Sequence, residues 1–201
     1  MHDLRARIEG HLARFDRIAL PHEGRRLAAV AIVVAPTDAG PAFLLTRRAM
    51  HLRRNAGNYA LPGGGLDPGE DAVAAACRET REEVGVDLGA EAALGLLDDF
   101  ATLGGHVVTP VVLWSAEPLH PVANPDEVHV VWQVPLGDLD HPRAPRREKH
   151  PDGGPPILRM FARGGWVNPP TAAFLWQFRE VCLHGRAART DQIGQPTWTA
   201  R

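Results

Sequence analysis

Apolar residues follow two different periods along this chain, and each period predicts a different kind of element. Near the start, Leu4, Ile8, Leu12 and Phe15 recur every three or four residues, which predicts an amphipathic helix over residues 2–16. Further on, unbroken or alternating apolar runs flanked by glycine and proline are typical of strands. We expect strands at residues 27–35, 42–46, 59–61, 94–101, 106–116, 127–134 and 157–162, and a last helix at residues 171–183.

These elements fall into one central unit with a short segment on either side. The predicted boundaries are an N-terminal helix and linker at residues 1–26, one domain at residues 27–185 and a C-terminal tail at residues 186–201. The tail shows no apolar periodicity, so we expect it to be disordered. Residues 140–156 are rich in proline and charge and predict a long surface excursion. Because helix and strand runs mix in the central unit, the pattern predicts an α/β/α sandwich around a mixed β-sheet.

One further helix is predicted in the middle of the chain, between two turn signals. Asp67-Pro68-x-Glu70 is typical of a helix start with aspartate as the N-cap, and Gly85 is typical of the left-handed residue that ends a helix. Between these signals lies an apolar stripe formed by Val73, Ala76, Cys77, Thr80 and Val84. We expect this stripe to pack inside the protein, with Cys77 as a buried free thiol.

Three carboxylates share another face of the same helix. Glu79, Glu82 and Glu83 are spaced i, i+3 and i+4, so they are neighbours on the helix surface. Oxygen-rich clusters of this kind suit hard divalent cations such as Mg²⁺ or Mn²⁺. The alternative is a solvated acidic helix face, which three glutamates alone do not exclude.

The spacing of the whole segment resembles a known signature. The sequence runs Gly64, five residues, Glu70, seven residues, then Arg78-Glu79-x-x-Glu82-Glu83-x-Gly85-Val86. This pattern resembles the Nudix box of hydrolases that cleave a diphosphate joined to another group. The resemblance implies the Nudix α/β/α sandwich around a mixed β-sheet, a hydrolytic enzyme and a divalent metal cofactor, Mg²⁺ or Mn²⁺.

The resemblance also implies roles for individual residues. The implied metal site consists of Glu79, Glu82 and Glu83, one of which doubles as general base, together with Gly63 and Glu70. Arg78 would hold the glutamates in place, and Glu70 would support the helix or an outer-shell metal. Glycine at position 64 lets the backbone approach the metal. Glu127 lies at a strand start where several family members supply a further catalytic glutamate, with a solvated strand-end charge as the alternative.

The segment before the box resembles one branch of that family, the coenzyme A pyrophosphatases. Leu44-Leu45-Thr46-Arg47-Arg48 is followed by Leu52-Arg53, Gly57 and Leu61-Pro62-Gly63-Gly64. With further matches after the box, the resemblance extends over about residues 27–185. The branch usually has Ser where Ala49 stands, Phe where Leu61 stands, and Trp-Gly-x-Thr-Ala where residues 167–172 read Val-Asn-Pro-Pro-Thr-Ala. These departures concern the pocket edge, whereas the box is intact.

The branch resemblance implies a substrate and the residues that bind it. The implied reaction is hydrolysis of coenzyme A or an acyl-coenzyme A to 3′,5′-ADP and (acyl-)4′-phosphopantetheine. Candidates for binding the substrate phosphates are Gly64, Arg47, Arg48, Arg53 and Arg54. One alternative is a pyrophosphatase for ADP-ribose, a dinucleotide or a nucleotide sugar. A second is a non-catalytic Nudix domain that binds a nucleotide.

Composition narrows the range of partners. A net charge of −2 over 201 residues gives no electrostatic reason to expect nucleic acid. No apolar run approaches the roughly 20 residues of a membrane span. Two cysteines form no disulfide framework, which fits a reducing cytosol and predicts a cytoplasmic protein. The expected partner is a small nucleotide substrate, and the sequence leaves open whether the chain forms a homodimer.

Overall fold

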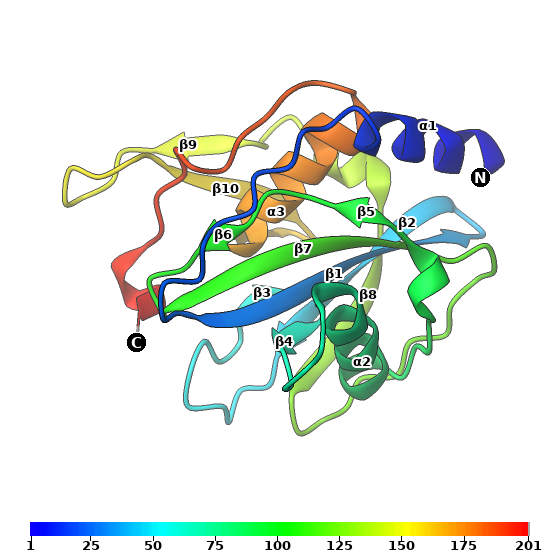
Figure 1. The fold of residues 1–201 in the computed structure, drawn as a ribbon, viewed down its shortest axis with the longest axis horizontal. Helices are drawn as coiled ribbons and strands as arrows, with labels where there is room; N and C mark the ends of the chain where they lie inside the picture. The colour runs from blue at the N-terminus through cyan, green and yellow to red at the C-terminus, as the bar shows by residue number, and fades with distance from the viewer. Residues whose placement is uncertain (201) are drawn as a thin grey trace.

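The computed structural model describes residues 1–200, which fold around one large mixed sheet (Figure 1). Its strands are β1 (Arg26–Thr37), β2 (Gly40–Arg48), β3 (Tyr59–Ala60), β4 (Gly63–Gly65), β5 (Ala93–Leu96), β6 (Phe100–Ala101), β7 (His106–Trp114) and β8 (Val128–Pro135). The strand order is β3-β2-β1-β7-β5, with β4 paired to β1, β6 to β7 and β8 to β2. Because β1 pairs in parallel with β7 and antiparallel with β2, the sheet is mixed.

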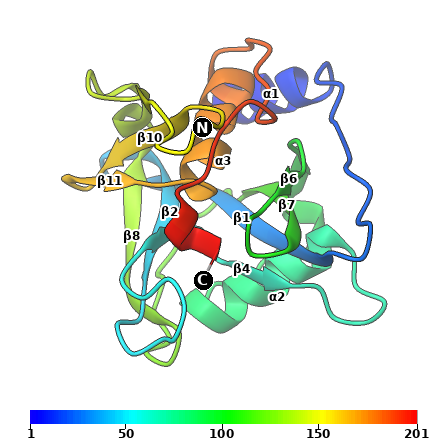
Figure 2. The ribbon, with the colours of Figure 1, turned by 90° about the vertical axis from the view of Figure 1, so that its left-hand side faces the viewer.

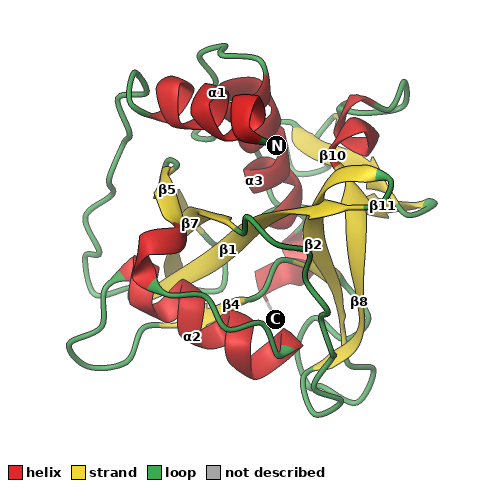
Figure 3. Ribbon diagram, turned by 90° about the vertical axis from the view of Figure 1, so that its right-hand side faces the viewer, coloured by secondary structure: helices red, strands yellow, loops and turns green. Residues whose placement is uncertain are grey.

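Helices cover both faces of this sheet (Figure 3). Helix α2 (Ala72–Val84) lies on one face, and α1 (His2–Leu12) and α3 (Thr171–Phe178) lie on the other. Shorter turns are η1 (Ala90–Ala92), η2 (Leu136–Asp140), the π-helical η3 (Arg179–Leu183) that continues α3, and η4 (Thr197–Ala200). A small second sheet consists of β9 (Arg146–Glu148), β10 (Ile157–Ala162) and β11 (Gly165–Val167). The predicted α/β fold with a mixed sheet and flanking helices is therefore confirmed.

Strand β1 is buried on both faces, which explains why its sequence is an unbroken apolar run. Successive side chains of a strand point to opposite sides of the sheet. Ala29, Ala31 and Val33 pack in the smaller core together with α2. Ile32 and Val34 pack in the larger core on the side of α3. A strand enclosed in this way has no solvent-facing positions that would need polar residues.

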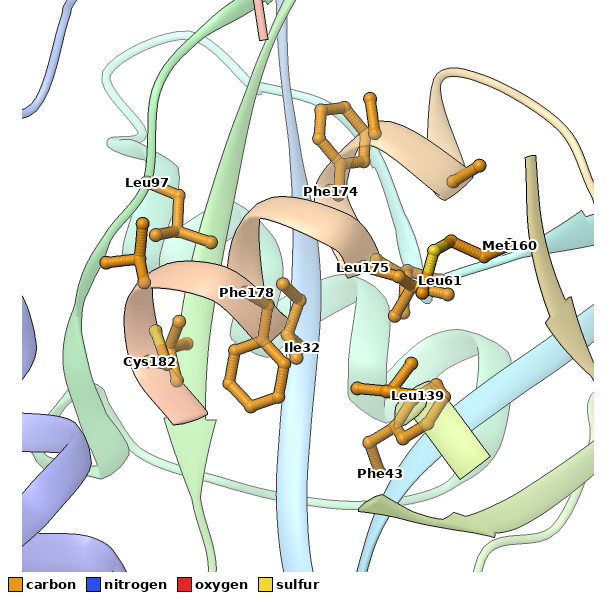
Figure 4. Packing of buried hydrophobic residues seen from close by; sticks show 14 of the residues in the cluster. Ile32, Phe43, Leu61, Leu97, Leu139, Met160, Phe174, Leu175, Phe178 and Cys182 are labelled. Carbon is orange, nitrogen blue, oxygen red and sulfur yellow. The ribbon is translucent and has the colours of Figure 1, made fainter. Parts of the chain in front are cut away.

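The larger core lies between the sheet and α3 (Figure 4). Phe178 projects from α3 toward Ile32 of β1 (Figure 4). Phe174, Phe178, Ile32 and Phe43 of β2 all belong to this core and are at most 1% exposed. The ring of Phe174 also meets the edge of Phe100, with 5.7 Å between the ring centroids. These aromatic contacts fix α3 across the middle strands of the sheet.

Several predicted elements differ from the structure at their ends. The first helix ends at Leu12 rather than at residue 16. The segment 94–101 forms two short strands, β5 and β6, instead of one. Glycines 63–65 form the short strand β4, because their backbone pairs with β1. Within the predicted excursion at residues 140–156, β9 pairs with β10, so this segment belongs to the second sheet.

The C-terminal segment is ordered against the rest of the chain, contrary to the disorder expected for residues 186–201. Ala188, Thr190 and Ile193 are buried. The backbone N–H of Gly194 donates to the carbonyl of Pro156 at 2.9 Å. Apolar periodicity cannot reveal such a segment, because it is held by single buried residues and hydrogen bonds. Residue 201 lies outside the described residues. Among the described residues, no helix has the length and apolar character needed to cross a membrane.

Candidate active site

Helix α2 begins later than its sequence suggested. The N-cap is Asp71, whose side chain accepts a hydrogen bond from the N–H of Ala74. Asp67 instead belongs to a preceding turn, in which its N–H donates to the Glu70 carboxylate at 2.9 Å. Gly69 has a φ of +83°, which is incompatible with a continuous helix through this turn. The predicted N-cap at Asp67 is therefore wrong, whereas Gly85 ends the helix in the left-handed conformation as predicted.

The buried face of α2 only partly follows the predicted stripe. Ala76, Thr80 and Val84 are buried, and so is Ala75, which lay outside the predicted stripe. Cys77 is half-buried rather than buried, and its thiol points toward the carbonyl of Gly89 at 3.7 Å. Burial and three nearby carboxylates raise the pKa of this thiol, which disfavours the reactive thiolate form.

Three carboxylates converge beside the first residues of β4. Glu79 and Glu83 come from α2, and Glu127 comes from the residue before β8. Each offers a ligand oxygen, and these oxygens lie within 4.8 Å of one another. The loop before β8 is fixed to the helix because the N–H of Asn124 donates to the carbonyl of Glu83 at 2.8 Å. The structure thus places Glu127 in the cluster rather than in a solvated strand end.

Arg78 forms the centre of an ion-pair network that includes one of the three converging carboxylates, Glu79. Its Nε and Nη2 donate to Glu70 at 2.9 and 3.0 Å, and Nη2 also donates to the carbonyl of Gly65. Its Nη1 donates to Glu79 at 2.8 Å and to Glu82 at 3.1 Å. The Arg78 guanidinium lowers the pKa of Glu70, which therefore stays ionised as its partner. Glu70 acts on the site through Arg78, in line with the supporting role expected for it.

Glu82 is placed differently from the other box glutamates. Its side chain is 47% exposed and is paired with Arg78. Its oxygens are not among the three that converge. Metal ligation by Glu82 therefore stays a prediction, and in the described residues this carboxylate lies at the rim of the cluster.

The cluster carries more negative charge than its surroundings neutralise. Glu83 is 3% exposed. Burial, followed by the charge of Glu79, raises its pKa to about 8, although Arg48 and the N–H of Gly63 act in the opposite direction. Burial also raises the pKa of Glu79. Buried carboxylates that repel one another gain stability when a cation binds between them, so the donor set fits a divalent metal with oxygen ligands.

Two glycines of β4 make room for this cluster. A Cβ on Gly63 would lie 2.4 Å from the carbonyl oxygen of Ala29, which belongs to the adjacent strand β1. A Cβ on Gly64 would lie 2.2 Å from Oε1 of Glu79. Any side chain at position 64 would therefore occupy the place of a cluster carboxylate.

We expect Gly64→Ala to lower kcat by about 100-fold with little change in melting temperature. The added methyl group displaces the flexible Glu79 carboxylate, and a shift of about 1 Å in a catalytic group can cost that much. Gly65→Ala is the matched control, because a Cβ there has its nearest neighbour at 3.9 Å. Steady-state kinetics and thermal melts of both variants test this. Equal rates for the two variants would contradict a requirement for glycine at position 64.

A cavity of about 250 Å³ opens beside the cluster. Gly63, whose N–H contacts Glu83, lines this cavity. Of the four arginines predicted to bind substrate, Arg48 and Arg54 line the cavity. Arg53 is exposed and does not line it, and Arg47 donates to the carbonyl of Gly57 at 2.9 Å. The structure therefore divides the basic segment into two arginines at the cavity and two away from it.

Sequence reasoning placed residues 167–172 at the pocket edge and missed the other remaining walls of the cavity. Together these walls come from the turn between β6 and β7, from the residues before α3, and from the C-terminal segment. Asn168, Thr171, Gln195 and Trp198 belong to this set. Asn168 and Thr171 lie in the stretch 167–172 that departs from the branch pattern, whereas Gln195 and Trp198 lie in no recognisable motif and reach the cavity because the tail folds onto the sheet.

Residues 24–154 match the NUDIX domain. The chain is 37% identical over 179 residues to the "Uncharacterized Nudix hydrolase NudL" of Escherichia coli K12, covering 87% of this chain and 86% of that protein. It is 39% identical over 137 residues to the protein of the same name from Salmonella paratyphi B, covering 66% and 71%.

Solved structures agree with this result. A Nudix hydrolase from M. smegmatis, RenU, is 26% identical with a TM-score of 0.53, covering 82% of this chain and 90% of that one. A MutT/nudix family protein from Enterococcus faecalis is 21% identical with a TM-score of 0.50, covering 73% and 52%, and supports the fold alone. The chain belongs to the Nudix hydrolase family. The reaction class that accompanies this family and the glutamate cluster is metal-assisted hydrolysis of a pyrophosphate bond.

Proposed function

We propose that this protein hydrolyses coenzyme A or an acyl-coenzyme A to 3′,5′-ADP and (acyl-)4′-phosphopantetheine, with Mg²⁺ or Mn²⁺ as cofactor. The observation that carries the proposal is the cavity beside the glutamate cluster. Its wall includes Arg48, Leu61 and Gly63 from the segment that resembles the coenzyme A branch. The cluster carboxylates do not themselves line the cavity, but two lining residues, Gly63 and Arg48, act on Glu83, so a diphosphate bound at Arg48 would lie next to the cluster. The two cysteines of the protein are free thiols, which suits the reducing cytoplasm in which coenzyme A is used.

The chain's own residues would divide the chemistry among them. Glu79, Glu83 and Glu127 would hold the divalent cation, which supplies neutralisation of the diphosphate oxygens and activation of water. Arg78 keeps Glu79 in position through a hydrogen bond of 2.8 Å. Burial raises the pKa of Glu79, and burial together with the charge of Glu79 raises the pKa of Glu83 to about 8, so the cation would displace a proton from Glu83 when it binds at neutral pH. Arg48 lies close enough to the cluster to offset charge on Glu83 and on a bound phosphate.

The alternative substrate class is ADP-ribose, a dinucleotide or a nucleotide sugar, which would use the same cluster with a different fit in the cavity. A panel of coenzyme A, ADP-ribose and NADH with product identification tests the proposal. A kcat/KM for coenzyme A that exceeds those of the other two supports it. A higher kcat/KM for either competitor would replace it.

A second alternative is a catalytically silent domain that binds a nucleotide. All box glutamates and Arg78 are present, and Arg78 pairs with three of them, Glu70, Glu79 and Glu82, which is the arrangement expected of an active enzyme. Failure to release phosphate-ended products from every diphosphate in the panel, with Mg²⁺ and with Mn²⁺, would favour the silent domain.

We expect Arg54→Ala to raise the KM for coenzyme A more than the KM for dephospho-coenzyme A. Coenzyme A carries an additional 3′-phosphate, and a lost charged hydrogen bond costs about 1.5–3 kcal/mol, or about 10- to 100-fold. Arg53→Ala is the matched control, because this neighbouring arginine is exposed, as Arg54 is, but does not line the cavity. Steady-state kinetics of both variants on both substrates give the measurement. If the ratio of the KM for coenzyme A to the KM for dephospho-coenzyme A is the same in wild type and Arg54→Ala, this arginine does not bind the 3′-phosphate.

A further inference from the structure

One wall of the cavity comes from the C-terminal segment 194–199. This segment lies outside the region that matches the Nudix domain. Gln195, Trp198 and Thr199 line the cavity from this side. Figure 2 shows the corresponding red turn lying across the middle of this face of the molecule. The box alone therefore does not define the pocket of this protein.

Hydrogen bonds at Gln195 fix this segment in place. Its side chain donates to the carbonyl of Ala101 at 3.0 Å and accepts from the N–H of Leu103 at 3.1 Å. Its own carbonyl lies 3.0 Å from Nε2 of His150. One residue thus joins the tail to the β6–β7 turn on one side and to the loop after β9 on the other. A wall held by contacts on both sides can present its side chains in a fixed geometry.

Trp198 is the large aromatic residue on this wall. Its side chain is 44% exposed although it lines the cavity, so one part of the indole is free to contact a ligand. Nothing in the packing requires tryptophan there, because Trp198 is not part of either apolar core. An accessible indole in the wall of a ligand-sized cavity is a surface on which a nucleobase can stack.

The same cavity contains polar groups that have no partner within the protein. Oδ1 of Asn168 and Nε of Arg48 are buried and make no hydrogen bond to any described residue. Both residues line the cavity. Buried polar groups are normally satisfied, so two such groups at one cavity indicate hydrogen-bonding capacity kept for a ligand. A carboxamide can pair with the edge of a base, and a guanidinium can pair with phosphate.

We infer that Trp198 stacks on the nucleobase of the substrate, that Asn168 contacts the edge of that base, and that the C-terminal segment is therefore a specificity-determining wall. This inference rests on the proposed function insofar as the ligand is a nucleoside diphosphate derivative. The base lies between the tail and the residues before α3, and the diphosphate extends past Arg48 toward the glutamate cluster. The remainder of the substrate then leaves the cavity on the side of the cluster.

The test measures binding of 3′,5′-ADP without added metal, by calorimetry, to wild type, Trp198→Ala and Trp198→Phe. Base stacking is worth about 1–3 kcal/mol, so we expect Trp198→Ala to raise Kd by about 5- to 100-fold. Trp198→Phe retains an aromatic face, so its Kd for 3′,5′-ADP should rise much less than that of Trp198→Ala. Thr197→Ala is the matched control in the same turn, because Thr197 is exposed and does not line the cavity. Thermal melts verify that each variant is folded.

Two further measurements separate the possible outcomes. Affinity for 4′-phosphopantetheine, which has no base, should be the same in wild type and Trp198→Ala. A loss confined to 4′-phosphopantetheine would overturn the inference and place the pantetheine arm against the tail, and an unchanged Kd for 3′,5′-ADP would also overturn it. If wild type hydrolyses no diphosphate, the proposed function fails, whereas the binding data still decide whether Trp198 contacts a base.

Discussion

Glu83→Gln is expected to lower kcat by about 1,000-fold or more while the fold is retained. The substitution removes one charge from the converging carboxylates and keeps the volume of a side chain that is 3% exposed. A metal site contributes several kcal/mol to stabilisation of the transition state. Each 1.36 kcal/mol corresponds to a factor of ten in rate, which gives this estimate. Steady-state kinetics with saturating metal, together with a circular dichroism spectrum, measure the effect.

Glu82→Gln is the informative comparison, since it makes the same change one residue away. Its carboxylate lies at the rim and accepts a hydrogen bond from Arg78. We expect Glu82→Gln to lower kcat by about 10- to 100-fold, the range typical of groups that support metal ligands. Glu127→Gln should behave like Glu83→Gln if the three converging oxygens define the site. A near-normal rate for Glu83→Gln would refute the proposed metal site, and a larger loss for Glu82→Gln would move its centre toward the rim.

The fold was predictable where burial imposes one period on the sequence. β1 reads as apolar because both of its faces are covered, and α1 reads as amphipathic because Ile8 and Leu12 pack against the core. The box helix was predictable from its spacing, including its end at Gly85. Its start was not, because Asp67 and Asp71 both offer an N-cap side chain, and the positive φ of Gly69 decides between them.

The candidate site was predictable only as far as it is local in sequence. Glu79 and Glu83 follow from one helical turn, and Arg78 follows from the box. Glu127 reaches the cluster through the bond between Asn124 and the carbonyl of Glu83, a contact that no local pattern reports. The position of the tail was even less predictable, because the side chain of Gln195 forms hydrogen bonds with residues that lie 92 and 94 positions away. Long-range contacts made by single polar residues leave no periodic signal in a sequence.

Excess chelator is expected to abolish activity, and the metal-dependent rate is expected to rise from pH 6 to about pH 9. Below its pKa of about 8, Glu83 carries a proton that a cation must displace. The apparent metal affinity should therefore fall by about tenfold for each pH unit below 8 if one proton is displaced. Water activated by the metal must also lose a proton before it attacks, and this too makes the rate rise with pH. A rate that peaks in acid, or one insensitive to chelator, would be incompatible with this mechanism.

The same pKa determines how the stability of the metal-free protein depends on pH. In the unfolded chain Glu83 loses its proton near its ordinary pKa of 4.5, whereas the folded protein keeps that proton up to about pH 8. The folded state thus binds more protons over this interval, so the contribution of Glu83 to the free energy of unfolding falls as pH rises from about 4.5 to 8. Added Mn²⁺ or Mg²⁺ should offset the loss, giving a larger increase in Tm at pH 9 than at pH 6. Glu83→Gln lacks the titrating group, so its Tm should decline less than that of wild type over the same range. A parallel decline in both proteins would show that Glu83 is already ionised in the folded state without metal.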